Sequence, residues 1–341
     1  MNTIPTLAQL GWHQQSFPPR ADRATRPARV VRHDGSSVLV ADGTRVAHLH
    51  LPRAWAPVTV GDWVLADEDR PVELLTRRSL LRRRDPGSGG EQLLAANVDL
   101  VGVVCGLDRP VRAGRIERLV TLAWDAGATP LIVLTKADLV GEPSEARDVA
   151  LRAAPGCDVV VLSCDDPGGV DDLRSRLAGG TLVLLGESGA GKSSLVNRLI
   201  GADGVATGAV REGDHKGRHT TTSRQLHVIE GGCVIDSPGL REVGLVADGA
   251  SVDETFREIS DLAEQCRFSD CSHEHEPGCA VRRAVEDGSV DEARLRSWEV
   301  LRKESAAAEL RADERARRRR DRQRELIARD AQAMKRRGRG G

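Results

Sequence analysis

The sequence Gly186-Glu187-Ser188-Gly189-Ala190-Gly191-Lys192-Ser193-Ser194 decides the fold of this chain. It matches the pattern G-x-x-x-x-G-K-[ST] and stands between an apolar run at 181–185, predicted to be a strand, and a predicted helix at 194–200. The glycines let backbone N–H groups approach a phosphate chain, and the helix directs its positive end to the same place. We expect Lys192 to contact the β- and γ-phosphates and Ser193 to bind Mg²⁺. A chance glycine-rich turn is the alternative, but the strand–loop–helix context favours a phosphate loop.

Length and composition bound the remaining possibilities. The chain has 341 residues, of which 40% are hydrophobic and 30% charged, and its formal net charge is -1. This is enough sequence for two or three domains, and the charge balance indicates no polyelectrolyte partner for the chain as a whole. No apolar run approaches the length of a membrane span, and residues 1–10 lack the basic flank and long apolar core of a secretory signal. We therefore expect a cytoplasmic protein without a membrane partner.

The first 84 residues predict an arm followed by a small barrel. Residues 1–24 contain Pro18-Pro19 and no clear period, so we expect a flexible arm. Residues 25–84 contain short β-branched segments separated by turn dipeptides such as Asp34-Gly35 and Asp42-Gly43. This pattern is typical of an antiparallel β-barrel of the OB-fold type.

Barrels of this kind often bind RNA through a basic face with aromatic side chains. The candidates for such a face are Arg26, Arg29, Arg32, Trp55 and Trp63. The alternative is that the tryptophans belong to the barrel core and the arginines are merely solvated. The arginines at 77–84 and the glycine-rich sequence at 86–90 predict a basic interdomain linker, either a phosphate-contacting strip or a simple spacer.

From residue 97 the pattern changes to alternating strands and helices. An apolar run at 98–105, a helical pattern at 113–126 and a second apolar run at 130–134 are followed by similar patterns up to residue 185. Three strand–helix steps imply a mostly parallel sheet, with nucleotide-binding groups gathered at the carboxyl ends of its strands.

The second of these strands ends in Thr135-Lys136-Ala137-Asp138. The Asp138 carboxylate can accept hydrogen bonds from guanine N1–H and the 2-amino group, which adenine does not offer, and the stem of Lys136 can cover the base. Backbone N–H groups of Ser163 and Cys164, after the next strand, would lie where guanine O6 needs donors. These residues predict selection of GTP over ATP, although such a short string alone can also be a helix cap.

The segment after the phosphate loop predicts elements that sense the γ-phosphate. Residues 201–217 are glycine-rich, Thr220-Thr221-Thr222 follow, and a predicted hairpin ends in Asp236-Ser237-Pro238-Gly239. We expect Asp236 to reach Mg²⁺ through water, the Gly239 N–H to reach the γ-phosphate, and a threonine, with Thr221 as our choice, to complete the metal shell. In isolation, Asp-Ser-Pro-Gly would be an ordinary turn.

In this chain the guanine-binding residues precede the phosphate loop, whereas ordinary small GTPases have the reverse order. The chain therefore resembles a circularly permuted GTPase. With a barrel in front and the spacing Cys266-x4-Cys271-x-His273-x5-Cys279 behind, it is similar to the ribosome small subunit-dependent GTPase A family, RsgA, also called YjeQ. The resemblance implies an α/β GTPase domain with a mostly parallel sheet at 92–242, a mainly helical zinc-binding domain at 243–314 and a basic tail at 315–341.

The resemblance also implies an activity, which is hydrolysis of GTP to GDP and phosphate in late maturation of the small (30S) ribosomal subunit, stimulated by that subunit. The expected partners are GTP and GDP, the subunit with its rRNA, and other subunit-maturation factors, and we expect a monomer. Leu240 stands where many GTPases have a glutamine that orients the attacking water. The family points to His219 as the group that binds water or a phosphate oxygen; a switch-loop histidine without a chemical role is the alternative. Thr135 and Cys164 depart from the family, which usually has asparagine and alanine there.

The cysteines predict a metal site. Seven is an odd number, and three of them lie between 266 and 279, which favours a metal in a reducing compartment over a disulfide framework. The thiolates of Cys266, Cys271 and Cys279 with the His273 imidazole form the closed tetrahedral set typical of structural Zn²⁺. His275 is a competing ligand, although the family spacing favours His273, and unligated buried cysteines are another alternative. Three further cysteines are expected in the core: Cys105, Cys157 and Cys233.

The end of the chain is strongly basic. Residues 281–337 are rich in Ala, Arg, Glu and Leu and predict helix, and residues 315–341 carry twelve basic and three acidic side chains, a net charge of +9. Such a block is commonly a nucleic-acid contact or a disordered tail, and a solvated helix face is a third interpretation. Two other functions compete with that of a ribosome-dependent GTPase. One is a nucleotide-regulated RNA-binding protein whose hydrolysis is incidental, and the other is a P-loop ATPase or kinase, which the predicted guanine-reading residues disfavour.

Overall fold

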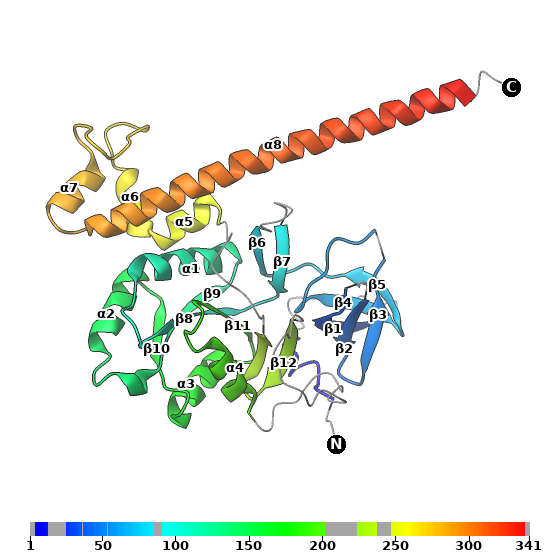
Figure 1. Ribbon diagram of the computed structural model, residues 1–341, viewed down its shortest axis with the longest axis horizontal. Helices are drawn as coiled ribbons and strands as arrows, with labels where there is room; N and C mark the ends of the chain where they lie inside the picture. Colours follow the sequence, from blue (N-terminus) through cyan, green and yellow to red (C-terminus); the bar gives the residue numbers. More distant parts are fainter. Residues whose placement is uncertain are drawn as a thin grey trace. The chain divides into compact units, whose positions relative to one another are not determined.

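The computed structural model describes residues 4–12, 25–35, 37–52, 54–84, 91–201, 224–236 and 247–337. The chain forms two compact units, Met1–Leu245 and Val246–Gly341. Figure 1 shows the helices and strands of each unit.

Five antiparallel strands near the N-terminus form a small barrel (Figure 1). They are β1 (Arg26–His33), β2 (Ser37–Ala41), β3 (Val46–His50), β4 (Trp63–Asp67) and β5 (Arg70–Leu74). β1 pairs with β2 and β4, β2 with β3, and β4 with β5, while β3 also lies against β5. Side chains from alternate positions, including Val30, Val38 and Val64, fill the interior. This is the strand order of an OB-fold, so the prediction from the β-branched pattern is confirmed.

The prediction that Trp63 lies on an RNA-binding face is wrong, because this side chain is only 1% exposed. Trp55 is partly buried against the barrel core, and its place on such a face stays a prediction. A tryptophan buries more apolar surface than most side chains, and a small barrel needs that surface for its core. Arg26 is exposed, whereas the Arg32 guanidinium pairs with Asp34 at 2.9 Å.

Arg29 is neither solvated nor part of a basic face, since it is 1% exposed. Its Nη2 donates to the Asn97 carbonyl over 3.1 Å and to Thr181 Oγ1 over 2.9 Å, and its Nη1 donates to the Leu10 carbonyl. Burial lowers the pKa of the guanidinium, although Cys233 opposes that effect. Because backbone oxygens from distant segments satisfy it, Arg29 joins the barrel to the sheet that follows.

Residues 4–12 are packed, so the prediction of a flexible arm is wrong for this stretch. Leu10 is fully buried, Trp12 meets Trp63 edge to face at 4.8 Å between ring centroids, and the Cys233 thiol donates to the Gln9 carbonyl over 3.2 Å. Burial of the apolar side chains of Leu10 and Trp12 stabilises the packing of this segment against the rest of the unit. The rest of the predicted arm, residues 1–3 and 13–24, lies outside the described residues.

A hairpin stands where a basic linker was predicted. β6 (Leu80–Arg84) pairs antiparallel with β7 (Glu91–Ala96). Arg77 binds the buried Asp62 at 2.7 Å, so this arginine holds the hairpin against the barrel instead of contacting phosphate. The linker prediction failed because Arg77, Arg78 and Arg82 pair with Asp62, Asp99 and Asp125 from other segments. The glycine-rich part of the predicted linker, residues 86–90, lies outside the described residues.

The central sheet has the strand order β10-β9-β8-β11-β13-β12, and β12 also pairs with β1 of the barrel. The strands are β8 (Leu100–Gly106), β9 (Thr129–Thr135), β10 (Asp158–Val161), β11 (Thr181–Gly186), β12 (Gln225–Ile229) and β13 (Gly232–Asp236). All neighbours from β10 to β13 run parallel, and β12 returns antiparallel beside β13. This is the mostly parallel sheet that the strand–helix alternation predicted.

Four helices cover this sheet in two layers (Figure 1). They are α1 (Ala113–Asp125), α2 (Ser144–Ala153), α3 (Pro167–Leu177) and α4 (Lys192–Ile200). α1 packs with α2 on one face, and α3 packs with α4 on the other, over a core that includes Leu173, Leu184 and Leu195. The carboxyl ends of the parallel strands therefore meet at one edge, where the predicted nucleotide-binding segments begin.

The second unit is helical. It contains α5 (Gly249–Thr255), α6 (Arg257–Ala263), α7 (Ala280–Glu286) and α8 (Glu292–Arg337), packed around Phe256 and Trp298. The predicted helix at 281–337 is thus interrupted between α7 and α8, where Gly288 adopts a φ of 79°. Within the described residues, no helix is both long enough and apolar enough to cross a membrane.

Candidate nucleotide site and metal centre

The phosphate loop joins β11 to α4 as predicted. Gly186 has a φ of 149°, and a Cβ there would lie 2.3 Å from the Val104 carbonyl oxygen, so only glycine fits. The Lys192 ammonium donates to the Gly186 carbonyl over 2.6 Å and also to the Glu187 carbonyl, which folds the lysine back over the loop. Ser193 and Ser194 are exposed in the first turn of α4. This arrangement leaves the lysine and the serine hydroxyls next to the backbone that would hold phosphates.

The predicted base-reading residues come together from two strands. Lys136 follows β9 with a left-handed φ of 60°, and a 3₁₀ helix, Ala137–Leu139, carries Asp138. Ser163, which lies just beyond β10, donates from its hydroxyl to Asp138 Oδ1 over 2.6 Å. Asp138 remains exposed, so its carboxylate is accessible to a ligand. Cys164 is half-buried against the core, and burial raises the pKa of its thiol.

Thr135 connects the predicted base-reading loop to the phosphate loop. It is fully buried, and its hydroxyl donates to the Ala190 carbonyl over 2.6 Å. The hydroxyl lies close to Gly191, where a Cβ would be 3.3 Å from Oγ1. Thr135, which stands where the family usually has asparagine, therefore forms a direct hydrogen bond between the two loops.

Four charged side chains and Lys136 form a network between the two loops that the sequence did not suggest. Asp108, after β8, accepts from Arg109 at 2.9 Å and pairs with Lys136 at 3.0 Å. The hydrogen bond from Arg109 has the largest effect on Asp108 and the one from Lys136 the next largest, and together they lower the pKa of Asp108 to about 2. Glu187 of the phosphate loop pairs with Arg109 at 3.8 Å and also with Arg115 of α1. No motif marks these contacts, because the partners belong to segments far apart in the chain.

Asp236 lies at the carboxyl end of β13, beside the strand that leads into the phosphate loop. It is half-buried, and burial raises the pKa of its carboxyl group, while His227 opposes that effect. The remaining predicted switch residues, His219, Thr221 and Gly239, lie outside the described residues.

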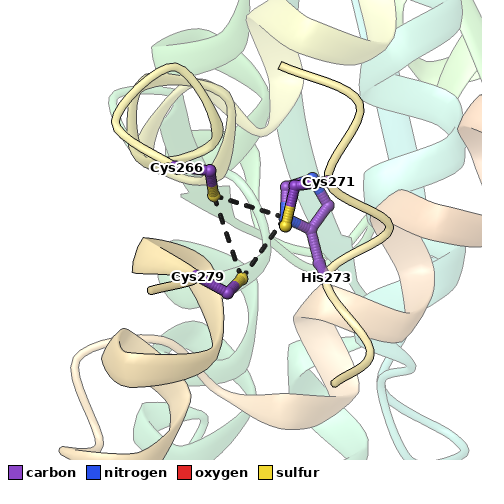
Figure 2. Close-up of side chains that lie close together, drawn as sticks. All are labelled: Cys266, Cys271, His273 and Cys279. Carbon is purple, nitrogen blue, oxygen red and sulfur yellow. Dashed lines mark hydrogen bonds between the residues drawn. The ribbon is translucent and has the colours of Figure 1, made fainter. Parts of the chain in front are cut away.

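A second site lies in the helical unit, where one imidazole and three thiols meet (Figure 2). The ligand atoms of Cys266, Cys271, His273 and Cys279 all lie within 4.8 Å of one another. His273 Nδ1 is 3.6 Å from Cys266 Sγ and 3.5 Å from Cys279 Sγ. His275 is exposed and stands outside the group, with its backbone N–H bonded to Glu276.

The helices hold this cluster in place. Cys266 follows α6, and Cys279 caps the N-terminus of α7, where its sulfur accepts from the Arg282 N–H over 3.3 Å. His273 takes a left-handed φ of 61° and lies 5.4 Å from the Trp298 ring. Soft thiolates with one imidazole, gathered around a single point, can hold a metal ion.

The fold and the first site define a class of protein. The phosphate loop, the segments predicted to read guanine and the Asp236 end of β13 lie at the carboxyl edge of one parallel sheet, and the predicted base-reading segments come first in the chain. These are the features of a P-loop nucleotide-binding protein with a circularly permuted order of elements.

Comparison with known proteins identifies the family. The sequence model of the RsgA GTPase matches residues 74–246. Small ribosomal subunit biogenesis GTPase RsgA of Streptomyces coelicolor is 44% identical over 329 residues, covering 91% of this chain and 90% of that protein. Small ribosomal subunit biogenesis GTPase RsgA 2 of Vibrio parahaemolyticus is 42% identical, covering 90% of this chain and 87% of that protein. The chain belongs to the RsgA GTPase family.

Solved structures agree with this assignment. The crystal structure of YjeQ from Thermotoga maritima is similar with a TM-score of 0.63 and 26% identity, covering 83% of this chain and 99% of that one. YloQ, a circularly permuted GTPase, has a TM-score of 0.60 at 23% identity, covering 85% of this chain and 98% of that one, and this similarity concerns the fold alone.

Proposed function

We propose that this protein is a GTPase that hydrolyses GTP to GDP and phosphate in the biogenesis of the small ribosomal subunit, and that the subunit stimulates the reaction. The observation that carries the proposal is the meeting of the two loops, since Thr135 binds Ala190 while Asp138 binds Ser163 at the same edge of the sheet. The names of the curated relatives, small ribosomal subunit biogenesis GTPases, support the partner.

Guanine recognition falls to the segments after β9 and β10. Asp138 accepts from the base N1–H and 2-amino group, and the N–H groups of Ser163 and Cys164 donate to O6. The Lys136 stem covers the base, and its ammonium is held aside by Asp108 at 3.0 Å. Because adenine lacks the donors that Asp138 needs, ATP is rejected.

The phosphate loop, Gly186–Ser194, holds the triphosphate through its backbone N–H groups, and Lys192 gives up its carbonyl partners to bind the β- and γ-phosphates. Ser193 and Asp236, with Thr221, are the residues that would hold Mg²⁺, and the Gly239 N–H would meet the γ-phosphate. The exposed serine hydroxyl and the carboxylate at the end of the neighbouring strand suit a hard cation. When bound, Mg²⁺ offsets charge on the phosphate oxygens. His219 is proposed to bind the attacking water.

The metal that fits the second site is Zn²⁺. Three thiolates and one imidazole are a closed donor set, with no position left for a substrate, so the role is structural. We assign Cys266, Cys271, His273 and Cys279 as its ligands.

The organisation of the chain suits binding to RNA. We propose a barrel that ends with β5 at Leu74, rather than at residue 84 as expected from the sequence, because residues 80–84 belong to the β6–β7 hairpin. It is followed by a GTPase domain at 92–242, a zinc-binding domain at 243–314 and a basic tail at 315–341 whose net charge of +9 favours phosphate contacts. We further propose that the protein acts in the cytoplasm as a monomer, with rRNA and other maturation factors as partners. The names of the relatives, which refer to biogenesis of the small ribosomal subunit, support the rRNA partner.

One assay separates this function from its competitors. GTP and ATP hydrolysis are measured with and without purified small subunits. We expect turnover with GTP that rises when subunits are added, and no comparable turnover with ATP. Equal hydrolysis of ATP would contradict guanine selection. Subunit binding without any stimulation would favour the RNA-binding protein with incidental hydrolysis.

A further inference from the structure

Arg109 lies beside the phosphate loop, on the connection between β8 and α1. Its side chain is 44% exposed, and its Nη2 is 3.4 Å from the point that a Cβ on Gly189 would occupy. Among the described residues beyond the glycine's own neighbours, no other heavy atom lies within 4 Å of that point. The guanidinium therefore lies next to Gly189, a glycine of the predicted phosphate loop.

The present partners of Arg109 allow it to turn towards a ligand. It bonds Asp108 at 2.9 Å and approaches Glu187 at 3.8 Å. Glu187 has a second cationic partner in Arg115. If Arg109 moved to a phosphate, Glu187 would keep one ion pair, and Asp108 would keep Lys136 at 3.0 Å. Both carboxylates thus remain neutralised when the arginine is recruited.

We propose that Arg109 is a catalytic residue that donates hydrogen bonds to the triphosphate and stabilises the charge formed when the β–γ bond breaks. This inference rests on the proposed GTPase function. In that reaction the water oxygen forms a bond to the γ-phosphorus, the bond from phosphorus to the bridging oxygen breaks, and its electron pair stays on GDP. The proton of the water passes to a phosphate oxygen. A guanidinium near the bridging oxygen offsets the negative charge that gathers there.

Leu240 stands where a glutamine would orient the water, and that task is proposed for His219. In the proposed site, Lys192 is the one side-chain cation so far assigned to the phosphates. Lys192 supplies a point charge, whereas a planar guanidinium can bond two phosphate oxygens at once. An arginine supplied within the same chain can raise the rate of GTP hydrolysis by several orders of magnitude. Arg109 is the guanidinium that approaches Gly189 most closely among the described residues.

The test compares Arg109→Ala and Arg109→Lys with Arg112→Ala, which removes another exposed arginine from the same connection. The full chain with Mg²⁺ is used for single-turnover GTP hydrolysis, for binding of N-methylanthraniloyl-GDP, and for binding of GDP with aluminium fluoride. We expect Arg109→Ala to slow hydrolysis at least about tenfold. Its affinity for the fluorescent GDP should stay within about threefold of the wild type, while tight binding with aluminium fluoride is lost. Arg109→Lys should recover little of the lost rate of hydrolysis, because an ammonium group cannot bond two phosphate oxygens in one plane as a guanidinium does.

Two results would overturn the inference. One is hydrolysis by Arg109→Ala within about threefold of Arg112→Ala, and the other is a loss of GDP affinity as large as the loss of rate, which indicates ground-state binding only. If the wild type and Arg112→Ala do not hydrolyse GTP at all, the proposed function itself fails and takes this role of Arg109 with it. If the wild type and Arg109→Ala hydrolyse GTP equally fast, the proposed GTPase function stands and only the proposed role of Arg109 is rejected.

Discussion

The Thr135 hydroxyl donates to the Ala190 carbonyl over 2.6 Å, across 55 residues of sequence. This bond joins the loop proposed to read the base to the loop proposed to hold the phosphates. In a permuted chain the two loops are separated by two strand–helix steps, so their alignment depends on contacts of this kind. The bond therefore helps to hold the proposed base and phosphate sites in register.

Replacing Thr135 with valine keeps the shape of the side chain and removes the hydroxyl. Because the Ala190 carbonyl then loses a buried donor, we expect a loss of about 1–3 kcal/mol in the free energy of unfolding of the first unit. Affinity for GDP should fall as well, since the loop is less fixed. Calorimetry and fluorescent-GDP titration measure both. Thr129→Val, at an exposed position of the same strand, is the control and should change stability by less than about 0.5 kcal/mol.

Asp138→Asn should change which base is bound. The amide replaces a carboxylate oxygen with a donor, so it meets the 2-amino group of guanine unfavourably but suits the 2-oxo group of xanthine. We expect at least about tenfold weaker binding of GTP and a gain for xanthosine triphosphate. Competition against fluorescent GDP measures both affinities. Glu142→Gln, an exposed neighbour, is the control, and unchanged base preference in Asp138→Asn would show that Asp138 does not read guanine.

Metal binding should distinguish two nearby histidines. His273→Ala removes a group whose Nδ1 lies 3.6 Å from Cys266 Sγ, so we expect loss of bound zinc and a lower melting temperature of the second unit. His275→Ala removes an exposed side chain outside the cluster and should keep the metal. Elemental analysis and thermal unfolding, with and without a chelator, provide the readout. Zinc lost from His275→Ala but kept in His273→Ala would reverse the assignment.

Arg29→Met should destabilise the first unit by about 3 kcal/mol. The methionine fills part of the volume but leaves the carbonyls of Leu10 and Asn97 without their donor. Denaturant unfolding measures the change. Arg26→Met, at the exposed start of the same strand, should have little effect; equal losses in the two variants would mean that the buried hydrogen bonds of Arg29 do not matter.

The strand–helix alternation and the phosphate loop could be predicted because their signals are local. Apolar runs, glycines and the helix start all lie within a few residues of one another, and the observed β11 and α4 follow them closely. The cluster of Cys266 and Cys279 was also visible, because thiol spacing in a short segment limits what the side chains can reach.

The failures concern residues whose partners lie far away in the chain. Arg29 looked like a surface charge, yet it is satisfied by oxygens from residues as distant as Thr181. Arg77 looked like part of a linker, yet it pairs with the buried Asp62. The contacts of Asp108 and Arg109 with Lys136 and Glu187 had no signature for the same reason, since Lys136 follows β9 and Glu187 follows β11.

We propose that one pocket, where the loops after β9 and β11 meet, binds guanine nucleotides. Displacement of fluorescent GDP from the wild-type chain by GTP and by ATP tests it most directly, with Lys192→Ala as the variant that should no longer bind either. We predict that GTP displaces the probe at concentrations at least about a thousandfold lower than ATP does. Equal displacement by the two nucleotides, or undiminished binding to Lys192→Ala, would contradict it.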